Sequence, residues 1–159
     1  MPVRMELSRI LIRELNDYQI IELREVAPVA EDGVAGAPGD PAAFSQVEGG
    51  RSFPIVIGLP EAQAIERRLK GIQIKRPQTH DLLMSVIDAM GGKLEYITIN
   101  DLSDQTFYAL LHVRDRAGTL VNIDSRPSDA IALGIASNVP IYVAEHVLDA
   151  VQKDDENEK

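Results

Sequence analysis

Hydrophobic residues recur along the chain with two periods, one typical of strands and one typical of helices. The clearest strand pattern covers Thr106–Arg114, where Phe107, Ala109, Leu111 and Val113 alternate with residues that face the other way. Similar apolar runs predict further strands at Met5–Leu15, Tyr18–Val26, Phe53–Leu59, Lys93–Leu102, Thr119–Asp124 and Pro140–Val143.

Helical spacing appears first after Pro60, where Ala62, Ile65 and Leu69 share one face and Gly71 ends the pattern. A second helix begins near Thr79, with Thr79 as its predicted cap. Its apolar stripe should lie across a sheet, and Gly91 and Gly92 follow it. The stripe consists of Leu82, Leu83, Val86, Ile87 and Met90.

A third helix is predicted from Pro127 to about Asn138, and it is apolar almost all round, which indicates a buried helix. A last helical turn is predicted at Val147–Val151. Strands and helices do not alternate regularly in this order, so the chain predicts an α+β fold. We expect a single compact domain with a mixed or antiparallel sheet of about seven strands and three to four helices.

The predicted domain spans residues 1–150. One segment within it and one segment after it differ in composition from the rest of the chain. Residues 27–50 are rich in glycine, proline and alanine, which favours a flexible insertion. Residues 151–159 carry Asp154, Asp155, Glu156 and Glu158, so we expect an acidic, solvated tail.

The composition narrows the possible chemistry. The chain of 159 residues has no cysteine, which excludes thiol catalysis, disulfides and cysteine-bound metals. No apolar run approaches the roughly 20 residues that span a bilayer, so we expect a cytoplasmic protein without a membrane partner. A formal net charge of -9 opposes nonspecific binding to a phosphate backbone, so a nucleic-acid role must depend on a local site.

Two polar clusters precede the second and third predicted helices. The first cluster contains Arg76, Thr79, His80 and Asp81. Helix capping by Thr79 and Asp81 accounts for it as a structural feature. The same residues also suit phosphate binding at a helix N-terminus, with Arg76 contacting the anion and His80 carrying a proton.

The second cluster runs into the buried helix and contains Asp124, Ser125, Arg126, Ser128 and Asp129. Capping by Ser125 or Ser128, and an ion pair between Arg126 and an aspartate, form one explanation. Alternatively, Asp124 and Asp129 converge on one divalent cation, since such cations prefer carboxylate oxygens.

An ordered series of short motifs carries a resemblance to a known family. The motifs are Arg51 with Phe53, Pro54, Ile55 and Gly58; Glu61 and Ala62; Arg76, Pro77, Thr79, His80, Asp81 and Leu82; Asp101, Leu102, Thr106, Phe107, Tyr108 and Ala109; and Asp124, Arg126, Pro127, Ser128, Asp129, Ala130, Ile131 and Ala132. In this series the chain resembles the bifunctional nuclease domain family over roughly Met5 to Leu148. The resemblance implies a compact α+β domain that cleaves DNA and RNA, and it adds Arg51 to the site candidates.

Taken together, these patterns favour a nuclease assisted by magnesium or manganese, with no organic cofactor. Asp124 and Asp129 would hold the cation, and His80, Asp81, Arg76, Arg126 and Ser128 are the catalytic candidates. Arg51, Thr79 and Ser125 are the predicted substrate-binding residues. The alternatives are a noncatalytic regulatory or interaction domain and a module that binds a small phosphate ligand such as a nucleotide. A homo-oligomer, with a dimer favoured, is expected.

Overall fold

The computed structural model describes residues 2–13, 15, 18–28 and 44–157. Most of the predicted insertion, residues 29–43, lies outside the described residues. The described elements follow one another as β1 (Val3–Leu11), β2 (Gln19–Pro28), β3 (Phe44–Gln46), β4 (Ser52–Ile57), α1 (Leu59–Lys70), α2 (Thr79–Ala89), β5 (Lys93–Ser103), β6 (Thr106–Arg114), β7 (Leu120–Ser125), α3 (Pro127–Ser137), β8 (Ile141–Val143) and α4 (Glu145–Asn157).

The described strands form one eight-stranded sheet in the order β3-β2-β1-β8-β5-β6-β7, with β4 paired to β2. β8 runs parallel to β5, and the other pairs are antiparallel. The mixed sheet and the four described helices confirm the predicted α+β class.

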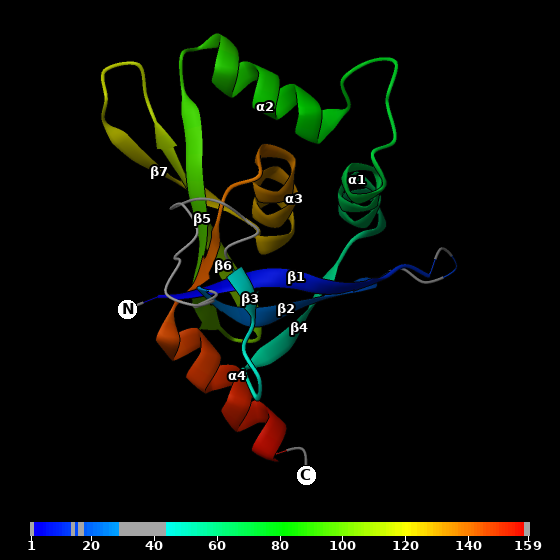
Figure 1. Cartoon of the computed structure of the whole chain (residues 1–159), viewed down its shortest axis with the longest axis vertical. Helices are drawn as coiled ribbons and strands as arrows, with labels where there is room; N and C mark the ends of the chain where they lie inside the picture. The colour runs from blue at the N-terminus through cyan, green and yellow to red at the C-terminus, as the bar shows by residue number, and fades with distance from the viewer. Residues whose placement is uncertain (1, 14, 16–17, 29–43, 158–159) are drawn as a thin grey trace, which may run out of the picture.

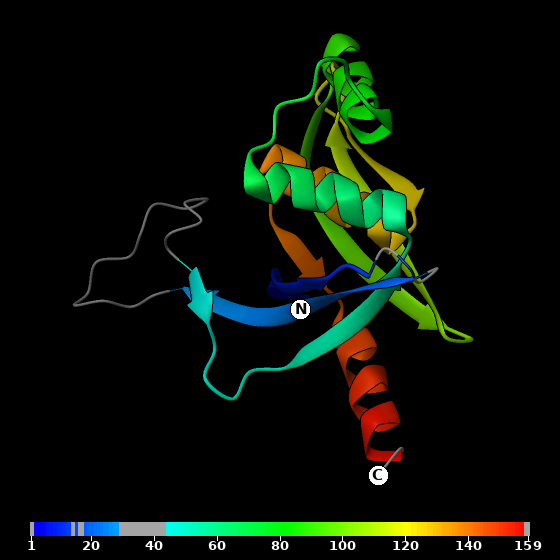
Figure 2. The same cartoon turned by 90° about the vertical axis from the view of Figure 1, so that its right-hand side faces the viewer.

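The buried helix α3 is the centre of the helical layer. It packs between α1 and the strands β5 and β6, and α2 lies over its end (Figure 1). α4 lies at the opposite end of the molecule and packs against β5. After a turn of 90°, α1 is seen crossing above β2 and β4 (Figure 2). Because Ala130, Ile131 and Leu133 of α3 are fully buried, the start of this helix is held rigidly.

Several local predictions are confirmed. Pro127 occupies the first turn of α3, and Asn138 ends this helix in the left-handed conformation, with φ of 55°. Gly71 ends α1 with φ of 66°. On β6, Ala109, Leu111 and Val113 face the core as the alternation predicts.

Two element predictions were wrong in their details. Leu59 begins α1 rather than ending the preceding strand, because Pro60 is accommodated in the first helical turn. The last helical turn is a helix of 13 residues, α4, which continues into the acidic segment. His112, which alternates with Leu111 and Val113 on β6, is also buried, since it stacks on Tyr96 at 4.1 Å between ring centroids.

The apolar stripe of α2 does not lie across a sheet, contrary to the prediction. None of the residues of α2 is buried. Leu82 is 55% exposed and Met90 is 73% exposed. Ile87 and Met84 pack against the edge of the core. α2 therefore covers the end of α3 and leaves much of its apolar face open.

None of the described helices combines the length and the apolar character that crossing a bilayer requires.

Candidate active site

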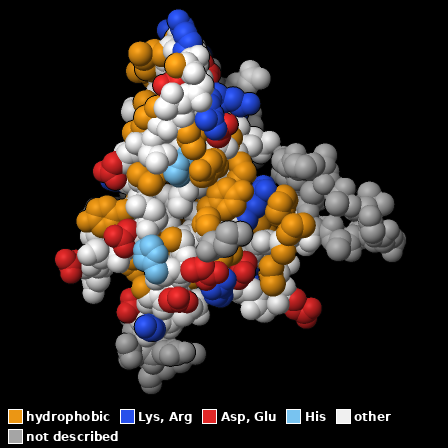
Figure 3. Space-filling model, turned by 90° about the vertical axis from the view of Figure 1, so that its left-hand side faces the viewer, with side chains coloured by type: hydrophobic (Ala, Val, Ile, Leu, Met, Phe, Trp, Pro, Cys, Tyr) orange, Lys and Arg blue, Asp and Glu red, His pale blue; other side chains and the backbone are white. Residues whose placement is uncertain are grey.

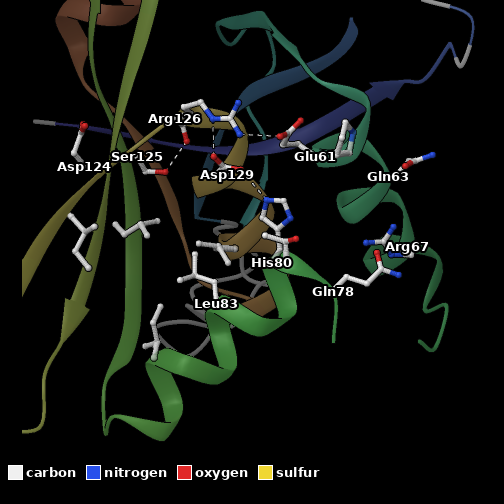
Figure 4. Close-up of a pocket in the computed structure, with 16 residues that line it drawn as sticks. Glu61, Gln63, Arg67, Gln78, His80, Leu83, Asp124, Ser125, Arg126 and Asp129 are labelled. Carbon is white, nitrogen blue, oxygen red and sulfur yellow. Dashed lines mark hydrogen bonds and ion pairs between the residues drawn. The ribbon is translucent and has the colours of Figure 1, made fainter. Parts of the chain in front are cut away.

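A cavity of about 760 Å³ lies where α1, α2 and the start of α3 meet the strands β6 and β7. Figure 4 shows the side chains that line it, which come from segments far apart in the chain. Its charged and titratable lining residues are Glu61, Arg67, His80, Asp124, Arg126 and Asp129. We call this space the first cavity.

A continuous chain of ionic hydrogen bonds crosses the first cavity. His80 Nε2 lies 2.9 Å from Asp129 Oδ1, and Arg126 Nε donates to Asp129 Oδ2 at 2.8 Å. Nη2 of Arg126 donates to Glu61 Oε1 at 2.9 Å. The chain Glu61–Arg126–Asp129–His80 thus joins α1, α3 and α2 (Figure 4).

Local sequence explains why these side chains meet. Pro127 fixes the first turn of α3, which places Arg126 at the N-cap position and Asp129 in the first turn, three residues apart. Glu61 occupies the corresponding first turn of α1, where a carboxylate is favoured by the helix dipole. A Cβ atom at Gly58 would lie 2.5 Å from Glu61 Oε2, so glycine at this position leaves space for the carboxylate.

Asp129 determines which nitrogen of His80 carries the proton. An ionised carboxylate only accepts hydrogen bonds, so the nitrogen that faces Asp129, Nε2, is the protonated one. In a neutral His80, the other nitrogen, Nδ1, is then free to accept a proton. Asp129 therefore orients His80 in the form that a general base requires.

The surrounding charges keep Asp129 ionised. Burial opposes ionisation, but the hydrogen bonds from Arg126 and His80 outweigh it and hold the pKa of Asp129 below its ordinary value of 3.8. In turn, the hydrogen bond to Asp129 raises the pKa of Arg126, which stays charged.

The other wall of the first cavity is apolar. It contains Leu83 and Ile87 of α2, Leu111 of β6, Ile123 of β7 and Leu133 of α3. Leu111 and Leu133 are buried, whereas Leu83 and Ile123 are about 40% exposed. A ligand in this cavity would contact ionic groups on one side and aliphatic groups on the other.

The structure brings several predicted site residues into the first cavity. Thr79, His80, Asp124, Ser125, Arg126 and Asp129 all line it. The expected caps were wrong, because the N-cap residues are Gln78 for α2 and Arg126 for α3. Ser125 Oγ instead donates to the carbonyl oxygen of Arg126 at 2.8 Å.

Other predicted site residues lie outside the first cavity. Arg51 pairs with Glu25 at 3.1 Å and with Glu145 at 2.9 Å, joining the edge of the sheet to α4. The carboxylate of Asp81 accepts from the backbone N–H of Gln78 at 3.1 Å. Arg76 is exposed in the segment between α1 and α2. Ser128 is buried beside a neighbouring cavity.

The sequence analysis did not assign Glu61 to the site, although its side chain is only 11% exposed and pairs with Arg126. An acidic residue in a first helical turn is commonly explained by the helix dipole alone. No local sequence pattern indicates its pairing with Arg126, because the two residues are 65 positions apart in the chain.

The described residues do not form a ready-made metal centre. No group of three or more histidine, aspartate or glutamate side chains among them is arranged to hold a metal ion. Both oxygens of Asp129 already accept hydrogen bonds, and Asp124 is exposed on β7. A cation shared by Asp124 and Asp129 would have to compete with Arg126 and His80.

The chain resembles known proteins over most of its length. The sequence model of the bifunctional nuclease domain matches residues 43–156, which include all elements of the first cavity. The chain belongs to the bifunctional nuclease domain family. The match begins just before β3 and ends inside α4.

Relatives of this family member occur in bacteria and plants. An uncharacterized protein of Mycobacterium tuberculosis is 43% identical over 103 residues, which cover 65% of this chain and 60% of the relative. Bifunctional nuclease 1 of Arabidopsis thaliana is 24% identical over 111 residues, which cover 67% of this chain and 34% of the plant protein. Bifunctional nuclease 2 of Oryza sativa is 28% identical over 108 residues and 33% of its length. The chain therefore spans only part of each relative.

Proposed function

We propose that this family member is a nuclease that hydrolyses phosphodiester bonds of DNA and RNA in the first cavity. The observation that carries the proposal is the chain Glu61–Arg126–Asp129–His80, in which an oriented histidine stands beside an arginine in a cavity large enough for a nucleotide. The plant relatives named as nucleases support the same activity.

In the proposed reaction, Nδ1 of His80 accepts a proton from a water molecule as the water oxygen attacks the phosphorus. The bond between phosphorus and the leaving oxygen breaks, the leaving oxygen takes up a proton from solvent, and the His80 imidazolium then returns its proton to solvent. Asp129 holds His80 in the required tautomer and stabilises the imidazolium that forms.

Arg126 is the proposed phosphate-binding residue. Its side chain is 67% exposed, whereas its partners Glu61 and Asp129 are more buried. The guanidinium has several donors, so it can contact a phosphate oxygen while keeping part of its contact with the carboxylates. Arg67, from α1, lines the same cavity and adds a second positive charge.

The lining of the first cavity contains three carboxylates and two guanidiniums, which leaves one negative charge in excess. A divalent cation would offset this excess, which supports the prediction that magnesium or manganese assists the reaction. Because both oxygens of Asp129 are engaged by His80 and Arg126, the cation would have to displace one of these contacts to bind Asp129.

The test is cleavage of end-labelled single- and double-stranded DNA and RNA with magnesium, manganese or chelator. The unsubstituted protein is compared with His80→Asn, purified identically. We expect His80→Asn to lower kcat by about 10²-fold or more, since general base catalysis contributes 10² to 10⁴. His146→Asn is the matched control, because His146 is 65% exposed and lies on α4.

Equal cleavage by His80→Asn and the unsubstituted protein would place the activity elsewhere or in a contaminant. If none of the three proteins cleaves any substrate, the interaction domain or the phosphate-binding module becomes the better explanation. Activity that survives the chelator would refute the proposed role of the cation.

We also infer that the protein forms a homo-oligomer. The exposed apolar residues of α2 lie near β7, which forms one edge of the described sheet and exposes Val121 and Ile123. An uncovered edge strand with apolar side chains favours pairing with another chain.

A further inference from the structure

A second cavity, of about 470 Å³, lies on the other side of Arg126. It is formed by β4, the turn between β5 and β6 and the first residues of α3. Arg126 lines both cavities. Its lining includes Tyr18, Ile55, Phe107, Arg126 and Ser128.

The N-terminus of α3 supplies donors at this position. Arg126 occupies the N-cap position and makes no side-chain cap hydrogen bond. The backbone N–H groups of Ser128 and Asp129 therefore have no intrahelical partner. Such groups, together with the positive end of the helix dipole and the adjacent guanidinium, favour an anion.

Ser128 gives an independent indication of a ligand. This residue is only 7% exposed and lines the second cavity, and its hydroxyl makes no hydrogen bond to any other described residue. The hydroxyl oxygen is not among the fully enclosed side-chain atoms that lack a partner, so it reaches the second cavity, where it can donate to a ligand. A phosphate oxygen in the second cavity would accept this hydrogen bond.

The remaining lining suits a nucleobase. Phe107 stacks on Phe53 with 5.6 Å between ring centroids, which fixes its ring. Tyr18, 56% exposed, adds a second aromatic ring, and Ile55 adds an aliphatic surface. Aromatic side chains stack with every base, so this lining favours a nucleobase but does not distinguish one base from another.

We propose that the second cavity binds the nucleotide adjacent to the one in the first cavity, so that a single strand crosses over Arg126. The proposal rests on the proposed nuclease function. The phosphate of this second nucleotide contacts Ser128, Arg126 and the start of α3, and its base contacts Tyr18 and Phe107. A base that enters the cavity has to leave a duplex stack, so single strands bind in preference to duplexes.

The experiment measures binding in the full chain carrying His80→Asn, which protects the probe from cleavage. The probe is a fluorescein-labelled single-stranded DNA of eight nucleotides, followed by fluorescence anisotropy, and the same sequence as a duplex is the second probe. Adding Ser128→Ala or Tyr18→Ala should raise Kd for the single strand about fivefold or more. Ser103→Ala and Tyr108→Ala are the matched controls, because both residues are exposed and lie outside the second cavity.

Unchanged Kd in both Ser128→Ala and Tyr18→Ala would overturn the proposal, as would a duplex that binds as tightly as the single strand. If the unsubstituted protein cleaves nucleic acid while these variants bind normally, only the second cavity is refuted. If the variants weaken binding but no protein cleaves, the cavity is supported and the nuclease reaction is refuted. Tyr18 is exposed, so its replacement tests the cavity even if Ser128→Ala unfolds.

Discussion

Arg126 forms ion pairs with two carboxylates, and both carboxylates are more buried than the arginine side chain. Glu61 and Asp129 lie in the first turns of α1 and α3, and both are largely buried. Removing Arg126 would leave these two negative charges without their shared partner, which is costly for buried groups. Arg126 therefore has a structural role in addition to the proposed contact with phosphate.

At the residue scale, the low pKa of Asp129 predicts an acid-sensitive contribution to stability. A carboxyl whose pKa is depressed by folding stabilises the protein fully above its ordinary pKa of 3.8, and the contribution is lost as the pH falls through the folded-state value. We expect Asp129→Asn to lower the free energy of unfolding by about 1–3 kcal/mol at pH 7. Urea denaturation at pH 7 and below pH 3 measures the difference.

The difference between Asp129→Asn and the unsubstituted protein should shrink at the lower pH, because the carboxyl is then increasingly protonated in both states. Asp104→Asn is the control, since Asp104 lies in an exposed turn at φ of 50°, a conformation that asparagine also adopts. A difference that does not change with pH would show that Asp129 stabilises by packing and not by its charge.

At the element scale, α2 is attached to the fold through a few partly buried residues. It has 11 residues, and a helix of this length is marginal by itself in water. The packing of Met84 and Ile87 supports it, while Leu82, Val86 and Met90 remain exposed. Because α2 carries His80, its position matters for the first cavity as well as for the surface.

Leu82→Glu should therefore change assembly more than it changes folding. If the α2 face takes part in the inferred oligomer, the added charge lowers the molar mass in sedimentation equilibrium towards that of the monomer. The free energy of unfolding of the monomer should change by less than about 0.5 kcal/mol. Leu69→Glu on α1 is the matched control, since both leucines are 55% exposed. Equal masses for the two variants would exclude this face of α2 as the interface.

The same helix shows what the sequence could predict and what it could not. Spacing identifies residues that share a face, so the extent of α2 and its stripe were predicted well. Spacing does not say what covers a face, and the stripe was wrongly expected to be buried. The alternation on β6 gave a better result because strand pairing on both sides constrains which face meets the core.

The site was predicted in parts for a similar reason. His80 and Asp129 each belong to a recognisable local cluster, but their hydrogen bond joins residues 49 positions apart. Glu61 and Arg126 are 65 positions apart, and neither local pattern indicates the other. Local polar clusters therefore identify candidate residues, whereas the pairing among them depends on how α1, α2 and α3 pack.

At the scale of the whole molecule, the charge distribution limits how nucleic acid can bind. The formal net charge is -9, and acidic side chains gather towards the end of the molecule where α4 lies (Figure 3). The proposed phosphate contacts depend on Arg126 and Arg67, in a chain whose net charge opposes nonspecific binding to a polyanion. Binding should therefore involve few phosphates.

This restriction predicts a shallow salt dependence. For two neutralised phosphates of a single strand, the slope of log K against log salt is about -1.4, so raising the salt from about 50 to 200 mM weakens binding less than about tenfold. Anisotropy titrations of the His80→Asn protein over this range measure the slope. A slope of about -4 or steeper would require a broad basic surface and would contradict binding confined to the two cavities.

The position of β8 has a consequence for how the molecule is assembled. Among the described strands, this three-residue segment alone joins β1 to β5, so it connects the two halves of the sheet. It pairs Val3 with Val143, residues separated by nearly the whole described chain. Either half can form its antiparallel pairs from nearby residues, but their union requires closing a very long loop. During synthesis, the sheet therefore stays divided until β8 has left the ribosome.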